Sequence, residues 1–371
     1  MSEFDVVIVG GGIAGASLGA RIASRTGVAI IEAEDHAAMH ATGRSAAFWL
    51  AYYGGSQVIP LTMASLKPLL QGWPAGGGSL LRQRGALVIA AQSTDLSDEL
   101  AVENDCAPAR ELLGRDTLER LVPGLLPGWD HGLLDPSCAD IDVAALHQNC
   151  LAQFRRDGGQ LLLGAALQRA QRAGGKWKIE TAAGPISAAT VVNAAGAWAD
   201  AVATRCGVEP LNVQPYRRTI VQLRIGRSDL KDLPLVIDAF GRFYFKGESE
   251  NRLWVSPHDE TPSDPCDAAP EEIDVARAID FFQSVVDWPI EAVERKWAGL
   301  RSFTPARVPA YGYDAGSDGF FWCVGQGGFG IQTAPAASAL AASLLLREEP
   351  PSWLAGVDAA TYAPQRSSEV T

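Results

Sequence analysis

The sequence predicts an α/β fold of two lobes, in which a β-α-β domain that is discontinuous along the chain carries an inserted β-rich lobe of α+β type. Three observations predict it. Near the start, an apolar run is followed by glycines, a helical pattern and a second apolar run. Alternating, aromatic-rich segments occupy the middle, and a glycine cluster opens another helical pattern near the end. Strands that alternate with helices build parallel sheets, so we expect both ends of the chain in one domain.

The first unit is the best defined. Residues 6–9 are continuous apolar β-formers, as in a strand buried on both faces, and residues 28–31 form a second such run. A helical pattern over 14–24 connects them. We therefore predict a β-α-β unit whose second strand ends at Glu32.

The remaining elements follow from the same patterns. The segment 41–53 has no clear assignment, strands and loops are expected from residue 76, and the polar, proline-rich stretch 262–270 predicts a surface loop. A weakly ordered tail is expected after Pro350. The expected helices are 143–156 and 334–346, and the expected strands are 86–90, 160–163, 177–181, 190–193, 219–223, 242–245 and 253–255. The predicted boundaries place 1–75, 140–212 and 297–371 in the first domain, and 76–139 and 213–296 in the second.

Composition excludes some classes of function. Of 371 residues, 31 are Lys or Arg and 43 are Asp or Glu, so the net charge is −12. A negative protein repels polyanions, which argues against a nucleic acid partner. Neither the cysteines nor the five histidines have metal-ligand spacing. The six cysteines form no C-x-x-C pair and are expected to be free thiols: Cys106, Cys138, Cys150, Cys206, Cys266 and Cys323.

The chain opens on a strand, without a signal-peptide pattern. No apolar run approaches the ~20 residues that span a bilayer, so no transmembrane segment is expected. The predicted location is the cytoplasm, with peripheral contact at the inner membrane left open.

A glycine motif connects the first strand to the first helix. Gly10, Gly12 and Gly15 fit G-x-G-x-x-G, in which the first glycine allows a tight turn, the second a close approach of a pyrophosphate, and the third close helix packing. The helix N-terminus offers unpaired N–H groups to the phosphates. Glu32 stands 22 residues after Gly10, where a carboxylate accepts hydrogen bonds from a ribose diol. This predicts a Rossmann-like dinucleotide site, but the motif alone does not separate FAD from NAD.

Three further segments complete a family pattern. They are TGRSAA at 42–47, NAAGAW at 193–198, and WAGLRSF at 297–303 followed by GQGGFGIQ at 325–332. With the glycine motif, and in this order and spacing, they resemble the D-amino-acid oxidase superfamily of flavoproteins over nearly the whole chain. Within it, the sequence most resembles the bacterial D-arginine dehydrogenases. The resemblance implies a Rossmann-like FAD-binding domain with an inserted β-rich substrate domain.

The resemblance implies noncovalent FAD as the cofactor. No cysteine lies in 297–303 and position 48 is not a histidine, so no covalent link is expected. Reduced flavin carries negative charge that a helix N-terminus stabilises, which suits the late glycine cluster. The residues expected at the cofactor are Gly10, Gly12, Ile13, Ala14, Gly15, Glu32, Ala33, Thr42, Arg44, Ser45, Ala46, Ala47, Leu167, Ala195, Gly196, Trp198, Gly327, Gly330, Ile331, Gln332 and Thr333.

The resemblance also implies a carboxylate clamp. Two guanidinium groups and two tyrosyl hydroxyls give charge-assisted hydrogen bonds to a substrate carboxylate. The positions that match this clamp, and that are expected to be catalytic, are Arg301, Tyr244, Tyr53 and, as the second arginine, Arg218. The pocket beside them is expected to include Phe48, Ala86, Gln326 and Gly328.

Two positions depart from the D-arginine dehydrogenases. Ala86 stands where those enzymes carry a glutamate suited to a guanidinium, and Phe48 stands where they carry a histidine. A cationic side chain that is buried without a countercharge is costly. We therefore expect neutral or apolar substrates rather than arginine or lysine.

The predicted reaction is oxidative deamination of a small amino acid, foremost a neutral D-amino acid, by hydride transfer from the α-carbon to flavin N5. The imine then hydrolyses to a keto acid and ammonia. Alternatives with the same fold act on glycine, an N-methyl or cyclic amino acid, or a 2-hydroxy acid. The net charge disfavours a tRNA-modifying flavin domain, the clamp disfavours a flavin-binding protein without catalysis, and an NAD enzyme is the remaining alternative. The electron acceptor (oxygen, a quinone or a carrier) and the oligomeric state stay open.

Overall fold

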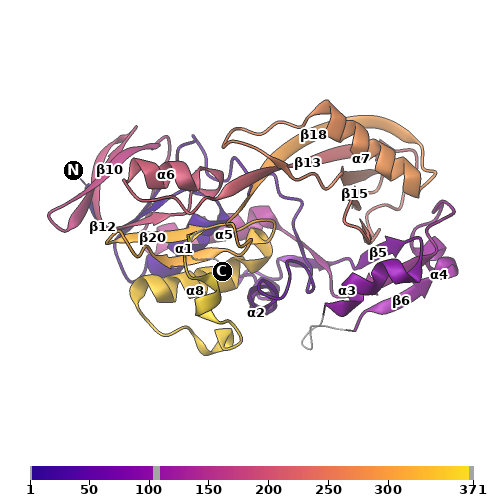
Figure 1. Ribbon diagram of the computed structural model, residues 1–371, viewed down its shortest axis with the longest axis horizontal. Coiled ribbons are helices and arrows are strands. Elements are labelled where there is room, and N and C mark those ends of the chain that lie inside the picture. Colours follow the sequence, from indigo (N-terminus) through magenta and orange to yellow (C-terminus); the bar gives the residue numbers. More distant parts are fainter. Residues whose placement is uncertain (1, 103–108, 367–371) are drawn as a thin grey trace.

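The structure is a computed structural model that describes residues 2–102 and 109–366. It has two lobes: α1 (Ile13–Ile22) and α8 (Gly330–Leu346), from opposite ends of the sequence, share the first, and the long strands β13 (Gln214–Ile225) and β18 (Ile290–Phe303) reach into the second (Figure 1). Within the described ranges, no helix has the length and apolar character needed to cross a bilayer.

A sheet with the strand order β10-β11-β12-β1-β2-β9 forms the first lobe, with β20 paired to β12 and β19 to β20. The central strands run parallel and are apolar on both faces, so both faces need cover. Helices α1 (Ile13–Ile22), α5 (Val143–Arg156) and α8 (Gly330–Leu346) cover one face, and α6 (Ala199–Arg205) covers the other. The strands are β1 (Ser2–Val9), β2 (Val28–Ile31), β9 (Gln160–Leu162), β10 (Leu167–Ala173), β11 (Lys176–Thr181), β12 (Gly184–Asn193), β19 (Ala310–Tyr313) and β20 (Phe320–Val324).

The second lobe is built on a sheet with the order β17-β13-β16-β15-β14-β5-β7-β6, in which β18 pairs with β13. Helix α7 (Glu272–Val285) buries one face of this sheet, where Phe282 packs in one cluster with Val221 and Phe245. The strands are β5 (Ala86–Ala90), β6 (Glu111–Gly114), β7 (His131–Asp135), β13 (Gln214–Ile225), β14 (Leu235–Asp238), β15 (Tyr244–Ser249), β16 (Arg252–Ser256), β17 (Thr261–Pro262) and β18 (Ile290–Phe303).

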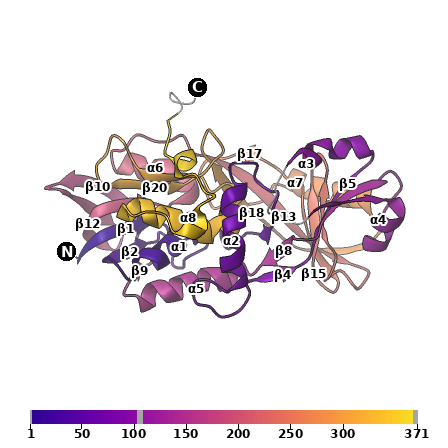
Figure 2. The same ribbon diagram turned by 90° about the horizontal axis from the view of Figure 1, so that it is seen from below.

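A small sheet with the order β3-β8-β4 lies where the chain passes between the lobes, and Figure 2 shows α2 standing in the same region. Its strands are β3 (Phe48–Trp49), β4 (Leu81–Gln83) and β8 (Ala139–Ile141). The other helices are α2 (Ile59–Leu70), α3 (Ser97–Ala101), α4 (Arg115–Leu121) and the short 3-10 helices η1 (Ser93–Leu96), η2 (Gly196–Trp198), η3 (Ser352–Leu354) and η4 (Ala359–Tyr362).

The predicted fold class is confirmed, and strands 28–31 and 86–90 and helix 143–156 have the predicted bounds. The sequence patterns do not predict α2, α4 or α7. Helix α7 begins after Glu271, which makes no side-chain cap, so the usual N-terminal signal is missing.

The cysteines at 138, 150, 206 and 323 are buried free thiols and Cys266 is an exposed one, whereas Cys106 lies outside the described residues.

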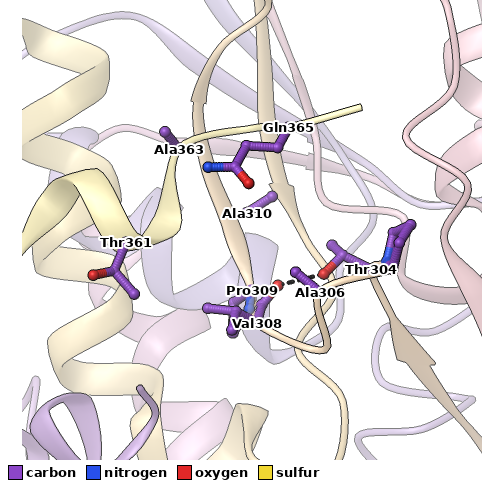
Figure 3. A pocket seen from close by; sticks show the side chains of 9 residues that line it. Thr304, Ala306, Val308, Pro309, Ala310, Thr361, Ala363 and Gln365 are labelled. Atoms are coloured by element: carbon purple, nitrogen blue, oxygen red, sulfur yellow. Dashed lines mark hydrogen bonds between the residues drawn. The ribbon is translucent and has the colours of Figure 1, made fainter. Parts of the chain in front are cut away.

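The prediction of a weakly ordered tail after Pro350 is wrong for residues 351–366. The side chain of Tyr362 is 1% exposed, and its hydroxyl donates to the Gln57 carbonyl at 2.6 Å. Residues 361–365 lie over the segment 304–310, with Thr361 and Gln365 facing a space of about 20 Å³ (Figure 3). That volume holds about one water molecule, so the tail is packed onto the first lobe rather than laid over a ligand site.

A buried ion cluster ties the small sheet to the second lobe. Asp140 accepts hydrogen bonds from Lys246 Nζ at 2.8 Å, from Arg84 Nε at 2.8 Å and from Arg82 Nη2 at 2.9 Å. Burial by itself would raise the pKa of the Asp140 carboxyl, but the charges of Lys246 and Arg84 outweigh burial and lower this pKa to about 2. The cluster therefore stabilises the folded protein only while Asp140 is ionised.

Replacing Asp140 by asparagine is expected to lower the free energy of unfolding by about 3 kcal/mol near pH 7, because Lys246 and Arg84 lose their countercharge. The folded pKa is depressed, so the contribution is complete above the ordinary carboxyl pKa of about 4 and is lost as the pH falls towards 2. Urea unfolding between pH 7 and 3 measures this difference. Asp232→Asn, which removes an exposed partner of Arg82, is the control with a smaller effect. Equal destabilisation by both variants would contradict the assignment.

Candidate active site

The glycine loop fits against the strand ends so closely that side chains are excluded. A Cβ atom at Gly10, whose φ is +110°, would lie 2.5 Å from the Ala194 carbonyl oxygen. A Cβ atom at Gly15 would lie 2.0 Å from the carbonyl oxygen of Gly10. The two glycines therefore hold the N-terminus of α1 against the ends of β1 and β12, and the binding of a phosphate by its N–H groups stays a prediction.

The segment after β2 folds back across this loop. The Glu32 carboxylate accepts hydrogen bonds from the Gly11 N–H at 2.7 Å and the Glu34 N–H at 3.1 Å. Thr42 Oγ1 accepts from the Ile13 N–H at 3.0 Å. Glu32 thus stands at the predicted place beside the glycine loop, and its contact with a ribose stays a prediction.

His147 is a residue of this region that the sequence patterns did not single out. Its Nε2 lies 2.8 Å from the Gly11 carbonyl oxygen, which requires Nε2–H to donate. Burial lowers the pKa of the imidazole, so the ring is neutral near pH 7. The signal was present as a histidine one turn into helix 143–156, but no motif links that position to the loop.

The NAAGAW segment turns under the same edge of the sheet. Gly196 has a φ of +55°, and the side chain of Asn193 accepts from the Ala195 N–H. The ring of Trp198 lies 4.6 Å from that of His40, centre to centre. Leu167, also expected at the cofactor, begins β10 and is buried.

These features fit a bound FAD. The glycine positions leave backbone where any Cβ would collide, and small residues line the turn after β12. A cavity of about 480 Å³ opens beside the loop, with Thr42, Ser45 and His147 in its wall. The residues present are thus compatible with a dinucleotide whose pyrophosphate lies at the start of α1.

Arg44 makes contacts that the sequence does not reveal. Its Nη1 donates to the Ala268 carbonyl at 2.8 Å and the Ala298 carbonyl at 3.0 Å, and its Nη2 pairs with Asp267. The guanidinium therefore anchors the segment 42–47 to the second lobe. A contact of Arg44 with phosphate or flavin stays a prediction, as do those of Ala46 and Ala47.

The late glycine cluster leads into α8. Gly327 has a φ of +53°, and Gly330 begins the helix, whose first turn has no side-chain cap. Gln332 does not point its side chain outward, since it accepts from the Leu50 N–H and donates to the Thr62 hydroxyl. The Thr333 hydroxyl donates to the carbonyl of Phe329, the residue before α8. For Gln332, the main chain therefore remains available to a cofactor, and for Thr333 the hydroxyl oxygen can still accept a hydrogen bond.

Arg301 and Tyr53 meet at the centre of the site. Arg301 Nη1 donates to the Tyr53 hydroxyl at 3.0 Å. A Cβ atom at Gly328 would lie 2.7 Å from that hydroxyl and 2.9 Å from Nη1. The backbone of Gly328 therefore borders the guanidinium so closely that no side chain fits between them.

Strand alternation brings Arg218 and Tyr244 to the same face. In the β13–β18 pair, Arg301 lies opposite Tyr216, and Arg218 lies opposite Gly299, two residues further along. Side chains at a spacing of two share a face, so both arginines face the first lobe while Arg217 faces α7. Tyr244, on β15, faces the same way as Arg218, and burial raises the pKa of its hydroxyl, which stays protonated near pH 7.

Only part of the Arg218 guanidinium is hydrogen-bonded. Its side chain is 5% exposed, and Nη2 donates to Glu260 at 3.3 Å, but Nε and Nη1 have no hydrogen-bond partner among the described residues. Burial, and then the charge of Arg301, lower the pKa of Arg218 to about 10, so it is still charged at neutral pH. Unpaired buried donors are costly unless a ligand satisfies them. The four clamp residues thus converge, and their role in carboxylate binding stays a prediction.

The predicted pocket residues lie beside the clamp. The ring of Phe48 is 6.2 Å from that of Tyr53 and 6.0 Å from that of Tyr244, centre to centre. Ala86, which is 1% exposed, belongs to the same apolar cluster. Gln326 is engaged differently, because its side-chain carbonyl accepts from the Tyr311 hydroxyl at 2.8 Å.

Comparison with known proteins places this geometry in context. Residues 5–344 match the model of the family described as FAD dependent oxidoreductase. The glycine oxidase of Pseudomonas putida is 25% identical over 388 aligned positions, which cover 97% of this chain and 98% of that protein. The dimethylglycine dehydrogenase of Mus musculus is 24% identical over 407 positions, with 99% of this chain covered. This chain spans only 45% of the length of the mouse protein.

The fold is shared with solved structures as well. The crystal structure of glycine oxidase from Geobacillus kaustophilus superposes with a TM-score of 0.83 at 23% identity, and 99% of each chain is covered. At this identity the likeness concerns the fold alone.

Proposed function

Because the chain belongs to the family of FAD-dependent oxidoreductases, we propose that it oxidises the carbon–nitrogen bond of a small α-amino acid, with glycine and its N-alkylated or cyclic derivatives as preferred substrates. FAD is the cofactor. The observation that carries the proposal is the convergence of Arg301, Arg218, Tyr53 and Tyr244, a donor set suited to one carboxylate.

The choice of substrate follows from the relatives. By their names, the similar proteins act on glycine and on dimethylglycine, and they favour this class over the neutral D-amino acid that the sequence patterns put first. The superfamily resemblance is confirmed, but these similar proteins do not single out the D-arginine dehydrogenases. Phe48 and Ala86 agree with the choice, because they bring no countercharge for a cationic side chain.

In this mechanism the protein orients the substrate. Arg301 and Arg218 bind the carboxylate, and the hydroxyls of Tyr53 and Tyr244 add donors that fix its plane. FAD, held at the glycine loop of Gly10, Gly12 and Gly15, would supply the two-electron oxidation at the α-carbon. Phe48 and Tyr53 exclude water from the reacting face, and the amine reacts in its neutral form after losing its proton to solvent. Water then hydrolyses the imine to a 2-oxo acid, which is glyoxylate for glycine, and to ammonia or an amine, which stays on the same molecule when the substrate is cyclic.

A substrate panel tests the proposal. The purified protein is mixed in the absence of oxygen with glycine, N-methylglycine, L-proline, D-proline, D-alanine, D-arginine or glycolate. The flavin absorbance at about 450 nm is followed after each addition. We expect fast bleaching by glycine, N-methylglycine or proline. Bleaching by D-alanine alone would restore the neutral D-amino acid as substrate, and bleaching by glycolate alone would remove amine oxidation altogether.

Ala86 offers a way to change the preference. Ala86→Glu is expected to raise the rate with D-arginine relative to N-methylglycine by about tenfold, since a buried carboxylate can pair with a guanidinium. Ala86→Gln, which has the same size without the charge, is the matched control. An equal change in both variants would show that size, not charge, sets the preference at this position.

A further inference from the structure

Three consecutive residues after β16 each contact an element of the carboxylate clamp. The ring of His258 lies 5.8 Å from that of Tyr244. Asp259 accepts from the Thr219 N–H at 2.7 Å and from the Thr219 hydroxyl at 2.9 Å. Because these contacts fix the loop on both sides, Glu260 is held in place beside β13.

Glu260 joins two arginines from different lobes. Its carboxylate accepts from Arg218 Nη2 at 3.3 Å and from Arg307 Nη2 at 3.0 and 3.1 Å. The guanidinium of Arg307 stacks over the ring of Phe303, 4.0 Å from its centre. The side chain of Glu260 is 38% exposed, so this residue lies at the edge of the site, whereas Arg218 is buried within the site.

The charges of the site can be counted. Arg301 and Arg218 bring two positive charges to the clamp, and Arg307 adds a third at its edge. Three negative charges face them: Glu260, which contacts both Arg218 and Arg307, the neighbouring Asp259, and the carboxylate of a substrate that has one. Like charges that are buried together without such compensation destabilise each other.

We propose that Glu260 is a specificity-determining residue, an internal counterion that occupies Arg218 and thereby restricts the site to substrates with one carboxylate. The inference rests on the proposed function, since it requires the clamp to bind a carboxylate. Without Glu260, Arg218 presents Nη2 together with its unpartnered Nε and Nη1, and the site takes a second carboxylate on the same molecule. A dicarboxylate derivative of glycine is then preferred to the N-methyl derivative.

Binding of two unreactive ligands tests this. Methoxyacetate and diglycolate are the ether counterparts of N-methylglycine and iminodiacetate, and they differ by one carboxylate. The flavin-loaded protein and its variants are titrated with each ligand by calorimetry. We expect Glu260→Gln to shift the ratio of the two dissociation constants towards diglycolate by at least about tenfold, which corresponds to about 1.4 kcal/mol.

The matched control is Glu294→Gln. Glu294 also bridges two arginines of the second lobe, Arg224 and Arg252, but it stands seven residues before Arg301 on β18, about 23 Å along the strand. The Glu294→Gln variant removes one negative charge, as Glu260→Gln does, without changing any contact of the clamp. An equal shift in both variants, or a shift below about twofold in Glu260→Gln, overturns the proposal.

Two further variants keep the test decisive. Glu260→Asp retains the charge and is expected to keep the preference for methoxyacetate. Arg307→Gln leaves Glu260 to Arg218 alone and is expected to maintain or sharpen that preference, so a shift towards diglycolate in this variant also overturns the proposal. If the unaltered protein binds neither ligand, the carboxylate clamp itself is wrong, whereas normal binding with an unchanged ratio in Glu260→Gln overturns only the role of Glu260.

Discussion

Replacing Arg301 by methionine is expected to lower kcat/KM for the substrate amino acid by about a thousandfold. Arg301 is the clamp residue that lies against both Tyr53 and the bare backbone of Gly328. Removing one partner of a buried, hydrogen-bonded charge pair costs on the order of 4 kcal/mol, because the other charge stays buried without compensation. The effect is measured as the rate of flavin reduction against substrate concentration without oxygen.

The flavin content of Arg301→Met should equal that of the unaltered protein, since its contacts lie with the substrate groups rather than with the glycine loop. Arg295→Met, on the exposed part of the same strand, is the matched control and should retain activity. Arg301→Lys should recover only part of the loss, because an ammonium lacks the planar fork that meets both carboxylate oxygens. If Arg301→Met keeps more than a tenth of the activity, the carboxylate is bound elsewhere.

Replacing Gly15 by alanine is expected to reduce the FAD content of the purified protein at least tenfold. The added Cβ would stand 2.0 Å from the Gly10 carbonyl oxygen, which is backbone and can move only with the whole loop. A displaced loop withdraws its N–H groups from the pyrophosphate. The ratio of flavin to protein absorbance gives the measurement.

A graded series separates this effect from general damage. Gly12→Ala is expected to give an intermediate loss, because its Cβ would meet only the Thr42 hydroxyl, at 3.2 Å. Gly356→Ala, where nothing lies within 4 Å, is the control with full FAD content. A Gly15→Ala protein that carries stoichiometric FAD would falsify the assignment of this loop to the pyrophosphate.

The sequence predicts the first lobe better than the second, for a physical reason. Strands such as 28–31 are apolar throughout because both faces are covered, and Gly10 and Gly15 stand where a Cβ atom would collide with the backbone, so local patterns carry the information. The second lobe depends on which face each residue takes. Arg217 and Arg218 are adjacent and chemically identical, yet one pairs with α7 and the other joins the clamp. Nothing in the local sequence determines which face of the strand each of these two arginines takes.

Long-range contacts define the rest of the site. Glu260 approaches Arg218 across 42 residues, and Arg44 reaches carbonyl groups more than 220 residues away. Such contacts leave no spacing signal, so an isolated glutamate or arginine looks like a surface charge. The clamp itself is visible in the sequence only through a family resemblance, whereas its geometry comes from the pairing of β13 with β18.

The pairing of β13 with β18 also constrains how substrate and product can be exchanged. The two strands are joined by a ladder from Gln214–Phe303 to Ile225–Ile290, and both clamp arginines project from it. If the lobes opened about a hinge, this pair of strands would have to bend or to move together with both arginines. We therefore expect the two arginines to keep their spacing while substrate and product are exchanged.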